Sequence, residues 1–139
     1  SGIIDNGKIL SIDIKPMKPI KNVKILNCDI FDRNTKNEIS SFFQGRLDVI
    51  ASDMAADTTG NKSLDSIRTN QLCAEVLNLS LKILKPTGVF VSKLFMGDDF
   101  LEVKNLAKSI FTDVSFFKPQ SSRSESKETY LHCKIFKSL

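Results

Sequence analysis

The feature that most constrains this chain is an almost unbroken apolar run at residues 88–95, Gly-Val-Phe-Val-Ser-Lys-Leu-Phe. A short run of this kind is typical of a strand buried in a parallel sheet. Lys93, near its end, is unusual because a buried ammonium group is costly unless it is paired. A second strand-like run, residues 47–52, leads directly to Asp53. Because ligands of open α/β sheets bind at the carboxyl ends of the strands, Lys93 and Asp53 are candidate site residues.

Strand and helix signals alternate along the rest of the chain. The expected strands are residues 8–13, 23–27, 47–52, 88–95, 113–118 and 129–137, and the expected helices are residues 34–44, 63–84 and 98–110. The order β-β-α-β-α-β-α-β-β predicts an α/β fold, in which helices cover both faces of a mostly parallel sheet.

Composition limits the class of protein. The chain has 139 residues, 41% of them hydrophobic, which is enough for one domain with a real core. No apolar stretch is long enough for a membrane span, and the first residues do not resemble a signal peptide. Cys28, Cys73 and Cys133 are odd in number and widely spaced, which predicts reduced thiols in a cytoplasmic protein. His132 has no partner histidine, so it is interpreted as an ordinary strand residue and no metal site is expected.

The charge is mildly basic, with a formal net charge of +4. Basic residues gather at positions 15–24 and 118–127. Such runs are compatible with a polyanionic partner, but they are equally typical of a solvated face.

Asp13 and Asp29 close the first two strand regions. In doubly wound nucleotide-binding folds, an acidic residue at such a strand end binds the ribose hydroxyls of the ligand, about 20 residues after a glycine-rich loop. Only twelve residues precede Asp13, and none forms a Gly-x-Gly loop. Either the chain starts after that loop or the nucleotide interpretation is wrong.

Three stretches of the sequence, taken together, indicate a family more specifically than the single aspartates do. They are residues 48–55 (Asp-Val-Ile-Ala-Ser-Asp-Met-Ala), residues 88–95, and residues 118–130 (Lys-Pro-Gln-Ser-Ser-Arg-Ser-Glu-Ser-Lys-Glu-Thr-Tyr). They resemble the FtsJ/RrmJ family of S-adenosylmethionine-dependent ribose 2′-O-methyltransferases, and the resemblance extends from about residue 7 to the C-terminus. The last stretch carries most of the specificity, because unrelated α/β domains do not contain it.

The resemblance implies a Rossmann-like methyltransferase fold and a catalytic Lys-Asp-Lys-Glu tetrad. By motif match, Asp53 corresponds to the aspartate, Lys93 to the second lysine and Glu128 to the glutamate of that tetrad. Lys93 would act either as the general base for the ribose hydroxyl or as a fixed cation that stabilises the developing alkoxide.

The implied cofactor is S-adenosylmethionine, with no metal. Asp13 would lie near its ribose and Asp29 near its adenine, with Ile14 and Ile30 beside the adenine ring, and Asp53 also close to the cofactor. The family's first lysine, its glycine-rich loop and its first strand have no counterpart in these residues. We therefore expect residues 1–139 to form a single methyltransferase domain that is N-terminally incomplete, with unpaired strand edges where the first strand would lie.

The implied activity is methylation of a uridine 2′-hydroxyl of large-subunit (23S) ribosomal RNA. The implied substrate is this RNA within the large ribosomal subunit, and the implied location of the enzyme is the cytoplasm. Arg68, Lys118, Arg123 and Lys127 are candidates for contacts with RNA phosphates, with a solvated surface role as the alternative for each. Two other classes of protein stay open: a catalytically silent RNA-binding module with the same fold, and another nucleotide-binding α/β enzyme such as a dehydrogenase.

Overall fold

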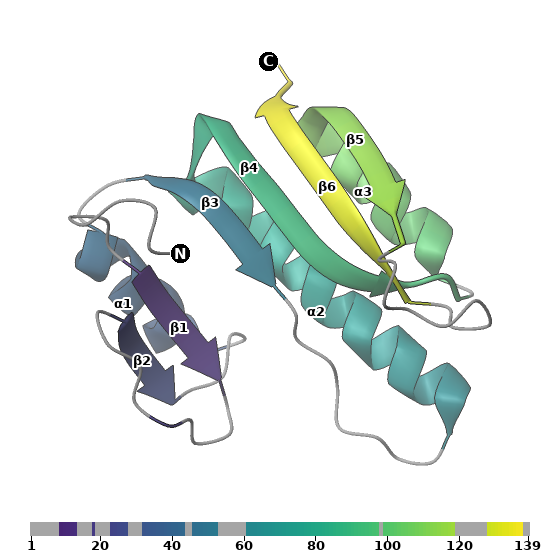
Figure 1. Ribbon diagram of the computed structural model, residues 1–139, viewed down its shortest axis with the longest axis horizontal. Coiled ribbons are helices and arrows are strands. Elements are labelled where there is room, and N and C mark those ends of the chain that lie inside the picture. Colours follow the sequence, from purple (N-terminus) through teal and green to yellow (C-terminus); the bar gives the residue numbers. More distant parts are fainter. Residues whose placement is uncertain are drawn as a thin grey trace. The chain divides into compact units, whose positions relative to one another are not determined.

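The computed structural model describes residues 9–13, 18, 23–27, 32–43, 46–52, 61–97, 99–118 and 128–137. The chain divides into two compact units, Ser1–Gly45 and Arg46–Leu139. The elements follow in the order that the sequence predicts, β1-β2-α1-β3-α2-β4-α3-β5-β6 (Figure 1).

The first unit contains two parallel strands and a helix. Strand β1 (Ile9–Asp13) pairs with β2 (Val23–Asn27), and Asp13 lies opposite Asn27 in the register. Helix α1 (Arg33–Phe43) begins after Asp32, whose side-chain Oδ1 accepts a hydrogen bond from the Asn34 N–H at 2.9 Å. A carboxylate in this position satisfies a backbone donor that the first turn leaves unpaired.

The second unit is built on a four-stranded sheet with the order β3-β4-β6-β5. Its strands are β3 (Leu47–Ser52), β4 (Leu84–Phe95), β5 (Phe111–Phe117) and β6 (Glu128–Phe136). Strands β3 and β4 are parallel, whereas β6 is antiparallel to both β4 and β5. The sheet is therefore mixed: one of its three strand pairings is parallel and two are antiparallel, because β6 runs against the other three strands.

Within the described residues, β1 pairs with β2 and β3 pairs with β4, and the two pairs belong to different sheets.

Both described helices of the second unit lie on the same side of its sheet (Figure 1). Helix α2 (Lys62–Ile83) packs on β4 and on α3 (Phe100–Ile110), and α3 packs on β5. Phe90, Leu94 and Leu131 point into this interface and are fully buried. These side chains form the core of the unit, and their burial is the main favourable contribution to its folding.

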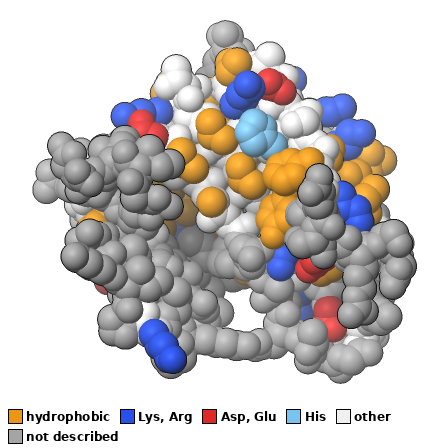
Figure 2. Space-filling view, in the orientation of Figure 1, with side chains coloured by type: hydrophobic (Ala, Val, Ile, Leu, Met, Phe, Trp, Pro, Cys, Tyr) orange, Lys and Arg blue, Asp and Glu red, His pale blue; other side chains and the backbone are white. Residues whose placement is uncertain are grey.

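We call the opposite side of this sheet the front face, because Figures 1 and 2 view it from the front. Its side chains follow from the strand register and include Val49, Val89, Val91, Lys93, Phe95, Phe117, Glu128, Tyr130, His132 and Lys134. Figure 2 shows hydrophobic side chains gathered there, and Val49 is 58% exposed. The sequence predicts helices on both faces of the sheet. Within the described residues of this unit, helices cover one face, and the front face is not covered by a described helix of the unit.

Strand β4 begins earlier than residue 88, the start predicted from the apolar run. The sequence Lys-Pro-Thr-Gly after α2 indicates a helix stop, but Leu84 already pairs with Leu47, and the register shifts before Val49 pairs with Val89. Arg46 stabilises this junction by donating hydrogen bonds from Nη1 to the carbonyls of Leu81 and Leu84. These carbonyls lie at the end of α2, where the helix leaves acceptors unpaired.

Cys73 and Cys133 are free and buried, as predicted, and Cys28 lies outside the described residues. None of the described helices combines the length and hydropathy of a membrane span. In the part of the chain that the structure describes, no three His, Cys, Asp or Glu side chains form a cluster that could hold a metal ion.

Candidate active site

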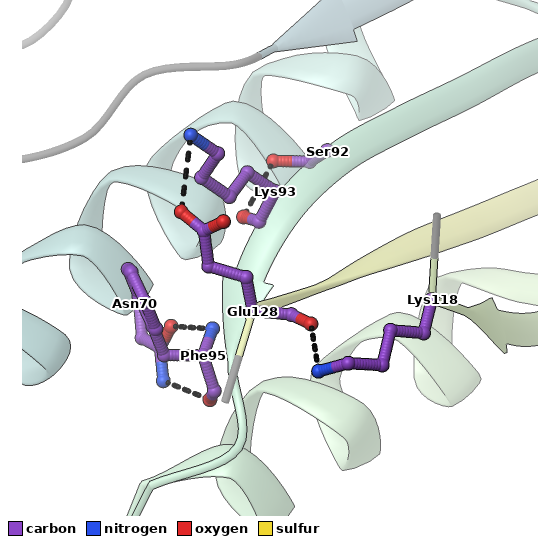
Figure 3. A network of polar contacts seen from close by, with 6 residues as sticks. All are labelled: Asn70, Ser92, Lys93, Phe95, Lys118 and Glu128. Carbon is purple, nitrogen blue, oxygen red and sulfur yellow. Dashed lines mark hydrogen bonds and ion pairs between the residues drawn. The ribbon is translucent and has the colours of Figure 1, made fainter. Parts of the chain in front are cut away.

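The structure brings two of the predicted site residues together. Lys93 lies near the end of β4 and Glu128 is the first residue of β6, and Lys93 Nζ is 3.4 Å from Glu128 Oε1 (Figure 3). In the antiparallel register Lys93 is opposite Tyr130 and Phe95 is opposite Glu128, so the ion pair runs diagonally between neighbouring strands. The fold therefore makes a charged pair from residues that are distant in the sequence.

The front face explains how β4 accommodates a lysine. Alternate residues of a strand point to opposite sides, so Ser92 and Leu94 face the helices while Lys93 faces the front. The Lys93 side chain is 15% exposed and that of Glu128 36% exposed. The ammonium group is thus partly shielded from water and has an anionic partner, which offsets the cost of its burial.

Asp53, the third predicted catalytic residue, lies outside the described residues. It directly follows Ser52, the last residue of β3, and Ser52 is opposite Ser92 in the parallel register. Lys93 directly follows Ser92. The described pairing of β3 with β4 therefore ends one residue before each of the two predicted catalytic residues, and β4 itself continues to Phe95.

Four of the five predicted cofactor residues belong to the first unit, and the fifth, Asp53, belongs to the second. Asp13 is the last residue of β1, and its backbone pairs with that of Asn27 in β2. Ile14, Asp29 and Ile30 lie outside the described residues. Their contacts with a cofactor therefore stay predictions.

Of the four candidate RNA contacts, two are described. Lys118 follows β5, is exposed, and donates a hydrogen bond from Nζ to the carbonyl oxygen of Glu128 at 3.3 Å (Figure 3). Arg68 is exposed on α2. Arg123 and Lys127 lie outside the described residues. Lys118 thus holds the start of β6, where Glu128 lies, in addition to carrying a charge.

One polar residue beside this site, Asn70 of α2, is not among the residues that the sequence patterns predict. It is fully buried, and its side-chain amide hydrogen-bonds both the N–H and the carbonyl of Phe95 at the end of β4 (Figure 3). A signal was present in the sequence: Asn70, Cys73, Leu77 and Ser80 recur at helical spacing, and all four are buried. A polar amide on the apolar stripe of a helix indicates a buried hydrogen-bond partner.

The two described cysteines are not suited to nucleophilic chemistry. Burial raises the pKa of the Cys73 thiol to about 11, against a smaller opposite effect from its hydrogen bond with Ser92. Burial, with smaller contributions from Cys73 and Asp113, raises the pKa of Cys133 to about 12. Since the thiolate is the reactive form, both side chains act as small core residues.

The arrangement of strands and helices defines the class of protein: it is a Rossmann-like methyltransferase fold. A crystal structure of a Plasmodium falciparum protein described as a ribosomal RNA methyltransferase matches with a TM-score of 0.79 and 28% identity, over 93% of this chain and 72% of that one. Human Methyltransferase-like protein 13, crystallised in complex with SAH, matches with a TM-score of 0.61 and 20% identity, over 92% of this chain and 61% of that one. The second likeness concerns the fold alone.

The family follows from the sequence. Residues 3–136 match the model of the FtsJ-like methyltransferase family, and the chain belongs to that family. It is similar to the "Ribosomal RNA large subunit methyltransferase E" of Pelagibacter ubique, with 42% identity over 99% of this chain and 68% of the relative. It is also similar to the protein of the same name from Rickettsia akari, with 46% identity over 91% of this chain and 56% of the relative. The chain thus spans 56% to 68% of the length of these relatives.

Proposed function

We propose that this chain is the catalytic domain of an S-adenosylmethionine-dependent RNA ribose 2′-O-methyltransferase that acts on ribosomal RNA of the large subunit. The observation that carries the proposal is the 3.4 Å pair of Lys93 and Glu128 at the ends of two neighbouring strands. The family membership and the names of the relatives support the same activity.

Lys93 is the central residue of the proposed mechanism. A ribose 2′-hydroxyl is a poor nucleophile until its proton leaves, and a neutral amine could accept that proton. At an ordinary lysine pKa of about 10.4, only about one amine in 2,500 is neutral at pH 7, which is a cost of about 4.6 kcal/mol. Since Glu128 favours the charged form, the geometry favours the second role, in which Lys93 stays a fixed cation beside the oxygen that develops negative charge.

Glu128 positions the Lys93 ammonium group. The pair is shielded from water but not fully buried, since the Lys93 side chain is 15% exposed and that of Glu128 36% exposed. Lys118 holds the carbonyl of Glu128, which restrains the start of β6. Asp53 is proposed to add a second carboxylate to this set of charges. A preorganised set of charges of this kind lowers the barrier because it requires little rearrangement during the reaction.

S-adenosylmethionine would supply an electrophilic methyl group on a sulfonium. Asp13 and Asp29 are proposed to bind its ribose and adenine, with Ile14 and Ile30 against the adenine ring. Carboxylates at the ends of neighbouring parallel strands suit the hydroxyls of a nucleoside. In this mechanism no metal takes part.

The finer proposal concerns the substrate. We infer that the methylated group is the 2′-hydroxyl of a uridine of 23S ribosomal RNA within the large subunit, in the cytoplasm. Arg68, Lys118, Arg123 and Lys127 would contact the phosphates, which supply affinity and register in RNA complexes.

The test is the substitution Lys93→Ala, assayed by transfer of labelled methyl groups from S-adenosylmethionine to undermethylated large subunits. We expect methyl transfer to fall by at least ~100-fold, the range of a lost acid–base or electrostatic group, while calorimetry still detects S-adenosylmethionine binding. Lys134→Ala is the matched control, since Lys134 lies on the same face and pairs with Asp113 at 3.7 Å. Full methyl transfer by Lys93→Ala would refute the assignment, and absence of cofactor binding by the unsubstituted chain would favour a silent RNA-binding module.

A further inference from the structure

Asn70 makes three hydrogen bonds with its side-chain amide. Its Oδ1 accepts from the Phe95 N–H at 2.8 Å, and its Nδ2 donates to the Phe95 carbonyl at 2.9 Å and to Asp99 Oδ1 at 2.7 Å. Both amide donors are therefore used, and the residue is fully buried. Asn70 thus joins three elements: α2, which carries it, the end of β4, and the residue that precedes α3.

The two hydrogen bonds between Asn70 and Phe95 take the place of strand pairing on the side of β4 that β3 occupies further back along the strand. A side-chain amide has the same donor and acceptor as a peptide group, so it can bind both polar groups of one strand residue. The described pairing of β4 with β3 extends to Ser92, and Phe95 lies three positions further on. Buried peptide groups without a partner are costly, and Asn70 supplies that partner at the last residue of β4.

The turn that follows β4 lies directly against α2. The Gly97 N–H donates to the Phe95 carbonyl at 2.9 Å, so this oxygen accepts two hydrogen bonds. A Cβ atom added at Gly97 would lie 2.6 Å from Ser66 Oγ, so the backbone approaches the helix as closely as a glycine permits. The end of β4 is therefore held by bonds and by close packing on the same helix.

We infer that Asn70 is a positioning residue for the Lys93–Glu128 pair, an inference that rests on the function proposed above. Phe95 is opposite Glu128 in the register, and Lys93 lies two residues before Phe95 on the same face of β4. The bonds of Asn70 to Phe95 hold the end of β4. This segment carries Lys93 and lies beside Glu128 in the neighbouring strand. Through Asp99 the same amide connects this segment to α3. A rigid strand end keeps the Lys93 ammonium in place, and a shift of about 1 Å at a reacting centre can cost about 100-fold in rate.

Two substitutions test the inference in the full chain. Asn70→Asp keeps the acceptor for the Phe95 N–H but turns a carboxylate oxygen toward the Phe95 carbonyl and the Asp99 carboxylate. Asn70→Ser removes the amide and leaves space for water, so it is the milder variant if the first does not fold. Gln71→Ala is the matched control, because Gln71 is the next residue of α2 and is exposed. Four quantities are measured well below the melting temperature: hydrogen exchange of the Phe95 amide, kcat for large subunits, KM for large subunits, and the pH dependence of kcat.

We expect both Asn70 variants to exchange the Phe95 amide faster and to lose at least ~10-fold in kcat with KM within about threefold, since positioning acts on the transition state. We also expect the pH dependence of kcat to shift, because the surroundings of Lys93 change. A merely structural role would lower the rate in proportion to the folded fraction, without shifting the pH dependence. That result, or wild-type kcat in both variants, would overturn the inference. Retained activity in Lys93→Ala would instead overturn the proposed function.

Discussion

Lys93 Nζ lies 3.4 Å from Glu128 Oε1 because β4 and β6 are antiparallel neighbours with Phe95 opposite Glu128. The pair is therefore a product of strand register, and a change of one residue in that register would turn the two side chains to opposite faces.

Glu128→Gln keeps the size of the side chain and removes its charge. We expect methyl transfer to fall by at least ~10-fold, since an electrostatic group near the reacting atoms is lost. The free energy of unfolding should also fall, by about 1 kcal/mol or more, because the Lys93 ammonium, whose side chain is 15% exposed, loses the anionic partner that offsets the cost of its burial. Methyl-transfer assays and urea unfolding measure the two effects. Asp113→Asn, which removes the charge that pairs with Lys134, is the control, and an unchanged rate in Glu128→Gln would contradict the proposed role.

Arg68→Ala tests the proposed RNA contact on α2. If Arg68 neutralises a phosphate, the slope of log K against log salt concentration should decrease by about 0.7 to 0.9, the value for one lost contact. Lys82→Ala is the control, because Lys82 is an exposed residue in the last turn of the same helix. RNA binding is measured at several salt concentrations. Equal slopes for Arg68→Ala and the unsubstituted protein would assign Arg68 to the solvated surface.

The buried thiols predict a loss of stability at alkaline pH. The unfolded thiols ionise near pH 9.0, whereas burial raises the pKa of Cys73 to about 11 and that of Cys133 to about 12 in the folded protein. Above pH 9 the folded state therefore binds more protons than the unfolded state, and the free energy of unfolding falls as pH rises. The loss at pH 10 is up to about 1.4 kcal/mol per thiol.

Urea unfolding at pH 7, 9 and 10 measures this loss. The double variant Cys73→Ala, Cys133→Ala should show a shallower decline with pH than the unsubstituted protein, although its stability at pH 7 is lower because a cavity replaces each sulfur. The same decline in both proteins would show that other groups cause it.

Ile135 in β6 has a φ of 66°, in the left-handed region that β-branched residues rarely adopt. Its side chain is 52% exposed, so replacing it removes little buried surface. Ile135→Asn should raise the free energy of unfolding by about 1 kcal/mol, because asparagine tolerates this conformation. Ile135→Ala keeps the unfavourable backbone geometry, so its free energy of unfolding should rise less than that of Ile135→Asn. Chemical unfolding compares the three proteins, and a lower stability of the asparagine variant would contradict the expectation.

The order of elements was predictable because periodicity is a local property. The helix predicted at residues 63–84 is Lys62–Ile83 in the structure, and the strand at residues 23–27 is Val23–Asn27. The start of β4 was predicted four residues too late. Lys-Pro-Thr-Gly indicates a stop, and only the pairing of Leu84 with Leu47 shows that the strand has already begun.

The candidate site was predictable only in part. Lys93 is conspicuous as a charge in an apolar run, but Glu128 was selected through its resemblance to a family motif. Asn70 was missed, because a single polar residue in a helix ordinarily faces solvent. Its partners, Phe95 and Asp99, are distant in the sequence, and the packing of α2 against β4 and α3 is needed to identify them.

The sequence by itself determined which segments become strands and helices, and which residue types are available for chemistry, since both depend on patterns within a few neighbouring residues. The tertiary structure decided that Lys93 contacts Glu128 and that Lys93 faces away from the helices. It also decided that Asn70 holds the end of β4, which carries Lys93, and that Lys118 holds the start of β6, which carries Glu128. These relationships depend on strand register and helix packing, which are set by hydrogen bonds and burial between segments far apart in the chain.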